Sequence, residues 1–164
     1  MKKINKEYYE IVKDILESDE FQKRKTYPHH GNITVYEHSI RVSYLAYKVS
    51  KYFKSVDTRC VAIGALLHDF YDEPWQGKLP KKPFFKKHGF VHAKQALINS
   101  EKLYPSHLND KIKDIIKKHM FPLNITPPKY KESWIVTICD KMISLEVLKK
   151  PAFFLALIIG IKKL

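Results

Sequence analysis

The chain has 164 residues, about the length of one domain, and 45% of them are hydrophobic, which argues against a disordered protein. Thirty Lys and Arg against 17 Asp and Glu give a net charge of +13, which attracts anionic partners such as nucleotides, nucleic acid or acidic lipid. Only three of the basic residues are arginines, the side chain that base reading favours, so nucleic acid is the less favoured partner.

Cysteine use and the composition of the two ends favour a cytoplasmic protein. Cys60 and Cys139 lie within apolar segments and fit reduced core residues better than a disulfide. Residues 1–20 are charged throughout and show no secretory signal. Residues 151–163 predict an apolar helix, which is well short of the roughly 20 residues that a membrane-spanning helix needs. We expect this helix to lie in the core or in a homodimer interface, with shallow membrane contact as the alternative.

The first part of the chain predicts two amphipathic helices joined by a loop. Apolar residues recur at helical spacing over residues 4–17, whereas residues 22–33 contain proline, glycine and asparagine and predict a loop. A second apolar stripe begins at Val35, and His38 falls on it. His38 is therefore predicted to point inward. Arg41 lies one turn along, on the flank of the same stripe, within reach of whatever His38 faces.

Residues 60–72, CVAIGALLHDFYD, predict the central helix of the fold. Their first eight residues are apolar or glycine, so the helix has no solvent-facing side. Asp57 is a plausible N-cap just before this run. His68 and Asp69 come at its end, and a buried carboxylate needs a partner. For the dipeptide alone, an ordinary capping or hydrogen-bonding role is the simplest interpretation.

The second half of the chain carries three more inward-facing polar residues on predicted helices. Residues 73–89 are rich in proline and lysine and predict a basic, aromatic loop that could act as a lid. The helix after it carries His92, and the next one places His119 in line with a stripe of isoleucines. Residues 134–148 predict a last helix with Asp140 on its apolar face.

These elements together predict an all-α protein, because alternating apolar and polar residues never persist long enough for a strand. The expected fold is a single compact helical bundle over residues 1–164. Its motif-bearing core spans residues 35–148, preceded by the helix of residues 4–17 and followed by the apolar helix of residues 151–163.

The inward-facing polar residues suggest a metal centre when they are taken together. Each of them alone is more often a hydrogen-bonded core residue than a ligand. Imidazole and carboxylate without thiolate, however, form the ligand set of Mn, Fe, Co, Ni or Zn in hydrolytic sites, and a metal neutralises otherwise costly buried carboxylates. The predicted ligands are His38, His68, Asp69, His92, His119 and Asp140.

The order of these residues resembles the H…HD…D signature of the HD superfamily of metal-dependent phosphohydrolases. The signature positions are His38, His68, Asp69 and Asp140. Two further histidines between the HD pair and the last aspartate resemble those of the subgroup that binds two metals. That subgroup includes HD-type diadenosine tetraphosphate hydrolases and, more distantly, HD-GYP cyclic dinucleotide phosphodiesterases. The resemblance implies a helical HD-domain bundle and a divalent transition metal, two per chain.

Position by position, the resemblance implies that the four signature residues hold one metal. It implies that His92 and His119 hold a second metal, with Asp69 as the bridge and with His68 and Asp69 as the catalytic pair. One position departs from the HD-GYP pattern, which has a lysine three residues after the HD pair, where this chain has Asp72. No GYP-type segment is present either, which makes cyclic dinucleotide hydrolysis a less favoured activity.

The expected function is hydrolysis of a phosphoester or phosphoanhydride bond in a nucleotide or related phosphate compound by a metal-activated water. The candidates for binding the substrate phosphates are Arg41, His30, Lys87 and His88. One alternative is a mononuclear nucleoside 5'-monophosphatase in which His92 and His119 are core residues. Another is a non-catalytic HD protein that senses nucleotides or binds nucleic acid, in which the basic surface is the functional one.

Overall fold

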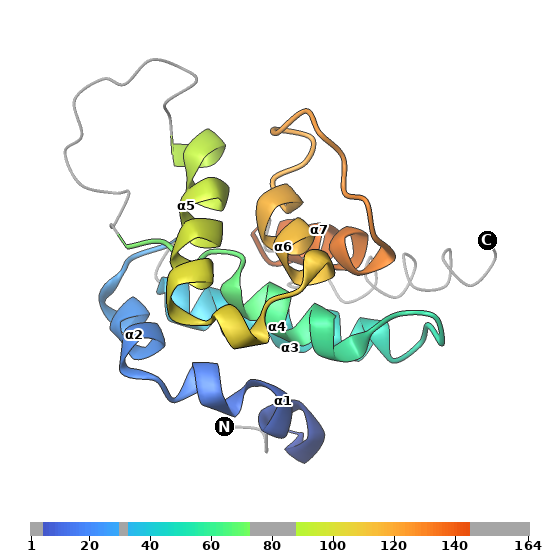
Figure 1. Cartoon of the computed structure of the whole chain (residues 1–164), viewed down its shortest axis with the longest axis horizontal. Helices are drawn as coiled ribbons and strands as arrows, with labels where there is room; N and C mark the ends of the chain where they lie inside the picture. The colour runs from blue at the N-terminus through green and yellow to red at the C-terminus, as the bar shows by residue number, and fades with distance from the viewer. Residues whose placement is uncertain (1–4, 30–32, 73–87, 145–164) are drawn as a thin grey trace.

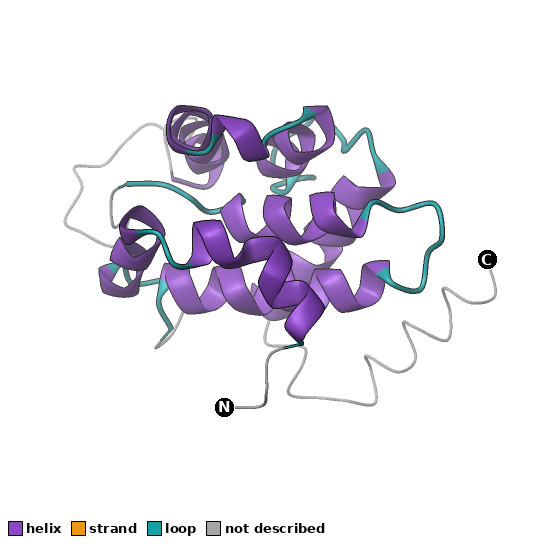
Figure 2. Cartoon of the chain, turned by 60° about the horizontal axis from the view of Figure 1, so that its bottom comes forward, coloured by secondary structure: helices purple, strands orange, loops and turns teal. Residues whose placement is uncertain are grey.

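The computed structural model of the chain describes residues 5–29, 33–72 and 88–144, with side chains described from residue 91 in the last range. The elements in chain order are α1 (Lys6–Leu16), α2 (Asp19–Gln22), η1 (Lys23–Thr26), α3 (Val35–Ser50), α4 (Thr58–Leu67), α5 (His88–Leu103), η3 (Pro105–His107), α6 (Asp110–Lys118) and α7 (Lys131–Ser144) (Figure 1). The described residues contain no strand, and one isolated bridge joins Pro28 to Thr34 (Figure 2). The predicted all-α fold is confirmed.

Helix α4 is the centre of the bundle, as its apolar sequence predicts. Every residue from Cys60 to Leu67 is buried, and α4 packs against α1, α3, α5, α6 and α7 (Figure 1). The predicted cap is present, because the Cys60 backbone N–H donates to Asp57 Oδ1 over 3.0 Å. At Gly64 an added Cβ would lie 2.6 Å from Ile115 Cδ1. Glycine is therefore what allows α4 and α6 to approach so closely.

The first part of the loop predicted for residues 22–33 is helical instead. It continues from α2 into the 3-10 turn η1, where the Arg24 side chain is 1% exposed. The Arg24 guanidinium lies 3.8 Å from the centroid of the Phe70 ring, and its Nη2 donates to Asp72 Oδ1 over 2.7 Å. These contacts join the N-terminal segment to the residues that follow His68 and Asp69.

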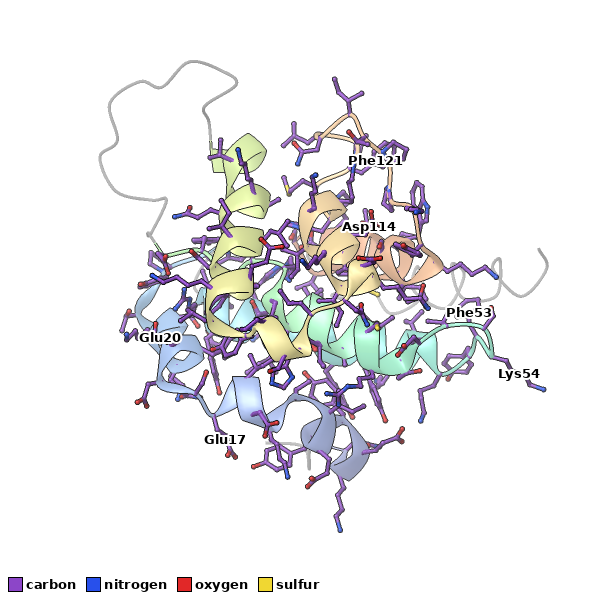
Figure 3. All side chains as sticks on the ribbon, viewed as in Figure 1. Glu17, Glu20, Phe53, Lys54, Asp114 and Phe121 are labelled. Carbon is purple, nitrogen blue, oxygen red and sulfur yellow. The ribbon has the colours of Figure 1, made fainter. Side chains whose placement is uncertain are left out.

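The connection between α6 and α7 is held by hydrogen bonds to one carboxylate. Asp114 on α6 accepts from the Ser133 hydroxyl over 2.7 Å and from the Lys129 backbone N–H over 2.9 Å. Phe121 in the same connection packs its ring edge-on against Trp134 of α7 (Figure 3). The orientation of α7 relative to α6 is thereby fixed at both ends of the connection.

Helix boundaries differ from the predicted ones by a few residues. The first helix covers Lys6–Leu16 instead of residues 4–17, because the Asn5 side chain caps it by accepting from the Tyr8 backbone N–H. The last described helix begins at Lys131, three residues before the predicted start. Residues 73–87, most of the predicted basic loop, and the predicted apolar helix of residues 151–163 lie outside the described residues.

Candidate metal centre

All six predicted ligands lie together at one end of α4. They come from five helices: His38 from α3, His68 and Asp69 from the end of α4, His92 from α5, His119 from the end of α6 and Asp140 from α7. Each of them is less than 9% exposed. Residues that are far apart in the sequence therefore meet at one place, because each lies on the inward face or at the end of its helix.

Helix ends orient two of the histidines. His68 is the C-cap of α4 and His119 is the C-cap of α6. In each ring Nδ1 lies within hydrogen-bonding distance of a carbonyl three residues earlier, 2.7 Å from Ala65 O and 2.8 Å from Ile116 O. Because those carbonyls are acceptors, Nδ1 carries the proton and Nε2 keeps its lone pair for the centre. This is the arrangement that fixes the tautomer of a metal-binding imidazole.

One set of ligand atoms surrounds Oδ2 of Asp69 and Oδ1 of Asp140. His38 Nε2 lies 3.1 Å from Asp140 Oδ1 and 3.7 Å from Asp69 Oδ2. His68 Nε2 lies 3.6 Å and 3.4 Å from the same two oxygens. Each of these two imidazoles thus lies within 3.1 to 3.7 Å of both carboxylates.

A second set surrounds the other oxygen of Asp69. Asp69 Oδ1 lies 3.3 Å from His92 Nε2 and 3.5 Å from His119 Nε2, and the two ring nitrogens are 2.9 Å apart. Asp69 therefore has one oxygen in each set, which is the geometry of a bridging carboxylate.

These separations fit metal ligands. Imidazole nitrogen and carboxylate oxygen bind transition metals at about 2.0 to 2.2 Å, which puts neighbouring ligand atoms about 3.0 to 3.4 Å apart. The separations of 3.1 to 3.7 Å between the imidazole nitrogens and Asp69 Oδ2 or Asp140 Oδ1 are close to that spacing. Three overlapping groups have ligand atoms within 4.8 Å of one another: His29 with His38 and Asp69, His38 with His68 and Asp140, and His68 with Asp69 and His119.

The charges of the centre stabilise one another. Burial alone raises the pKa of a carboxyl, but the surrounding imidazoles hold the pKa values of Asp69 and Asp140 well below their usual range. Burial likewise lowers the pKa of His68, yet the two carboxylates outweigh it and raise that pKa to about 9. Burial, together with the charges of His68 and His92, lowers the pKa of His119 to about 3. Ionised carboxylates and a neutral His119 are the forms that bind metal, whereas His68 must release the proton that the carboxylates favour before its Nε2 can bind one.

His29 belongs to the centre, although the sequence analysis did not select it. The side chain is buried, its Nε2 lies 3.6 Å from Asp69 Oδ2, and its ring centroid is 4.0 Å from that of His38. The His29 backbone N–H donates to Ile33 O over 2.9 Å, which fixes the residue beside the start of α3. The signal in the sequence is the adjacent pair of histidines, of which the second, His30, is the one predicted to bind substrate.

Lys141 is a second residue near the centre that the sequence analysis did not select. It follows Asp140 on α7, and its Nζ donates to the His119 carbonyl over 2.8 Å. Burial lowers the pKa of Lys141, and the nearby Asp140 and Asp69 charges oppose that shift. Lys141 lies off the apolar stripe of α7, so helical spacing gave no reason to place it near the ligands.

Of the four predicted substrate-binding residues, Arg41 is the one whose side chain the structure describes. Arg41 is exposed on α3, one turn beyond His38. His88 is the first residue of α5, but its side chain, like the whole of His30 and Lys87, lies outside the described residues. Their roles in binding substrate stay predictions.

The comparison with known families agrees with the fold and the centre. The family model described as the HD domain matches residues 35–145, more than half of the chain. The chain therefore belongs to the HD-domain family, which at the family level indicates a metal-dependent phosphohydrolase. No curated protein and no solved structure matches the chain. Among the described residues, no helix is both long and apolar enough to cross a membrane.

Proposed function

We propose that this protein is a hydrolase that uses two divalent transition-metal ions to cleave a phosphoester or phosphoanhydride bond of a nucleotide or related small phosphate compound. The observation that carries the proposal is the position of Asp69. One of its oxygens lies among His38 and His68, and the other lies against His92 and His119. A single buried carboxylate shared between two ligand sets is typical of dinuclear hydrolytic centres.

In this proposal His38, His68 and Asp140 would hold the first ion with Asp69, and His92 and His119 would hold the second. Two such ions would supply a more acidic bound water and positive charge opposite the attacked phosphate. The protein residues keep the ligands in place: Nδ1–H groups of two histidines are tied to helix-end carbonyls, so their rings cannot rotate freely. The positive charge of bound ions would offset the free-energy cost of burying the Asp69 and Asp140 carboxylates.

The donor chemistry favours transition metals over calcium. Four imidazoles and two carboxylates suit Mn, Fe, Co, Ni or Zn, whereas calcium prefers oxygen ligands. No thiolate joins the described ligand sets, because Cys60 and Cys139 lie in the apolar core. The proposal is therefore that the centre binds one or more of these five transition metals.

The test is turnover after controlled metal exchange. Protein stripped with a chelator is reloaded separately with Mn, Fe, Co, Ni, Zn or Ca and assayed on bis-p-nitrophenyl phosphate, p-nitrophenyl phosphate and a panel of nucleotides. We expect no turnover without metal, restoration by at least one transition metal, and little restoration by calcium. Equal activity before and after verified removal of metal would contradict the proposal. The substrate panel separates a phosphodiesterase from a phosphomonoesterase and from a dinucleoside polyphosphate hydrolase.

A mononuclear nucleoside 5'-monophosphatase is the second candidate, and one distance favours it. His92 Nε2 and His119 Nε2 are 2.9 Å apart, which is also the length of a hydrogen bond. In this alternative His92 donates to the His119 lone pair, and the pair supports Asp69 without binding metal. Metal analysis distinguishes the two candidates, because the mononuclear enzyme holds about one ion per chain instead of two.

A further inference from the structure

Lys141 is a partly exposed residue next to the buried ligand Asp140. Its side chain is 36% exposed, whereas that of the neighbouring Asp140 is 9% exposed. The stem leaves α7 beside Asp140, and the ammonium reaches the carbonyl of His119 at the end of α6. Both anchors belong to residues of the metal centre, so the position of the ammonium is fixed relative to both ligand sets.

The ammonium keeps hydrogen-bonding capacity for another partner. A lysine ammonium has three N–H donors. Within the described part of the chain, the His119 carbonyl is the acceptor that takes one of them, and Asp140 Oδ2 at 3.9 Å is beyond hydrogen-bonding distance. Two donors of the partly exposed ammonium are thus available for another acceptor. A cation with free donors beside a dinuclear centre suits the outer oxygens of a phosphate.

We infer that Lys141 is a substrate-contacting residue, whose ammonium donates hydrogen bonds to a non-bridging oxygen of the phosphate group being hydrolysed. The inference rests on the proposed phosphohydrolase function and adds the residue that recognises the anion. No proton is transferred to or from Lys141 in this role. The position three residues after the HD pair is Asp72, whose carboxylate has no positive charge to offer an anion and pairs with Arg24. Lys141 supplies a positive charge from α7 instead.

A purely structural role for Lys141 makes a different prediction. A cation that donates to a carbonyl at the end of α6 also stabilises that helix end. If this were its whole function, removing the ammonium would lower the melting temperature and leave phosphate binding unchanged. The test therefore needs a binding measurement and a stability measurement on the same variants.

The experiment compares Lys141→Met and Lys141→Arg with Lys117→Met in the full-length, manganese-loaded protein. Lys117 is exposed on the last turn of α6, two residues before His119. Lys117→Met is therefore the control, because it removes a positive charge of the same kind from the same region. Binding of inorganic phosphate is measured by calorimetry, together with metal content, melting temperature and the kcat and KM for bis-p-nitrophenyl phosphate.

We expect Lys141→Met to keep its metal and to bind phosphate about tenfold to a hundredfold more weakly, as loss of a charged hydrogen bond predicts. Lys141→Arg should stay within about threefold of the unaltered protein, because the charge and donors remain. Lys117→Met should bind phosphate as the unaltered protein does. Phosphate affinity of Lys141→Met equal to that of Lys117→Met overturns the inference, as does an unaltered protein that binds no phosphate.

Two further outcomes keep the inference separate from the proposed function. If the methionine variant does not fold, Lys141→Gln replaces it, since its amide can still donate to the His119 carbonyl, and unchanged phosphate binding in that variant overturns the inference. If the unaltered protein binds phosphate through Lys141 but hydrolyses no substrate, the anion site stands and the proposed hydrolase activity fails.

Discussion

The two sides of Asp69 differ in charge and in the number of ligands. Near Oδ2 lie His38 and His68, which also lie near the Asp140 carboxylate, and His29 is 3.6 Å away. Near Oδ1 lie His92 and His119. Among the described residues, the carboxylate that these two histidines contact is that of Asp69 itself. Because a divalent ion gains more from two carboxylates than from one, we expect the first position to bind metal more tightly than the second. The second position is the one on which dinuclear chemistry depends.

The largest expected effect comes from removing Asp69, which belongs to both sides. Asp69→Ala should lose both ions and lower turnover by at least about a thousandfold, since neither the water nor the phosphate is then held. Asp69→Asn is the matched control, because it keeps the shape and removes the charge. Elemental analysis and kinetics measure both effects, and a folded alanine variant with full metal content would refute the bridging role.

Replacing His92 or His119 tests the second side alone. Each alanine variant should lower bound metal from about two ions per chain toward one, and turnover should collapse. If the two residues are instead core histidines, metal content stays unchanged. The free energy of unfolding then falls by about 1 to 3 kcal/mol, because neighbouring polar groups lose their partners. Elemental analysis and thermal melts separate these results. Unaltered stoichiometry in folded His119→Ala protein would favour the mononuclear nucleotidase.

His29 provides a smaller test of the first side. The His29 Nε2 lies 3.6 Å from Asp69 Oδ2. His29→Gln should therefore lower the affinity for the more tightly bound ion about tenfold, as loss of a residue next to a metal ligand does. The affinity for the more weakly bound ion should not change. Calorimetric titration of metal-free protein with manganese resolves the two affinities. His107→Gln, on η3, is the control. A change confined to the weaker ion would mean that His29 acts on the other side of Asp69.

The smallest effect is expected at the opposite end of α4. Asp57→Ala removes the cap on the Cys60 N–H and should cost about 1 kcal/mol of stability, with both metal affinities unchanged. Chemical denaturation and metal titration on one preparation give the two values. Loss of metal in this variant would show that lower stability alone reduces metal binding. The metal loss predicted for the variants of the ligand residues would then no longer identify those residues as ligands.

Helical spacing predicted the ligands that lie on helix faces but not the residues placed by tertiary contacts. His38 and Asp140 were found because a helix repeats its faces at fixed intervals. His29 precedes α3 in a segment held by a short bridge, where no periodicity applies. Lys141 reaches the centre through a long side chain that crosses to another helix. The division of the ligands between the two oxygens of Asp69 likewise depends on how five helices pack, which local patterns do not specify.

The buried contacts of Arg24 bear on how the domain should be delimited. The region matched to the family begins at Val35, and it includes all six predicted ligands. Yet Arg24 pairs with Asp72, and the Tyr8 hydroxyl donates to Ser43 Oγ over 2.9 Å inside the core. A chain cut before Val35 would retain the inherited signature while leaving Asp72 without its cation and the core open. We therefore expect the folding unit to include α1 and the Arg24 segment as well as the region matched to the family, and shortened versions of this protein should begin ahead of α1.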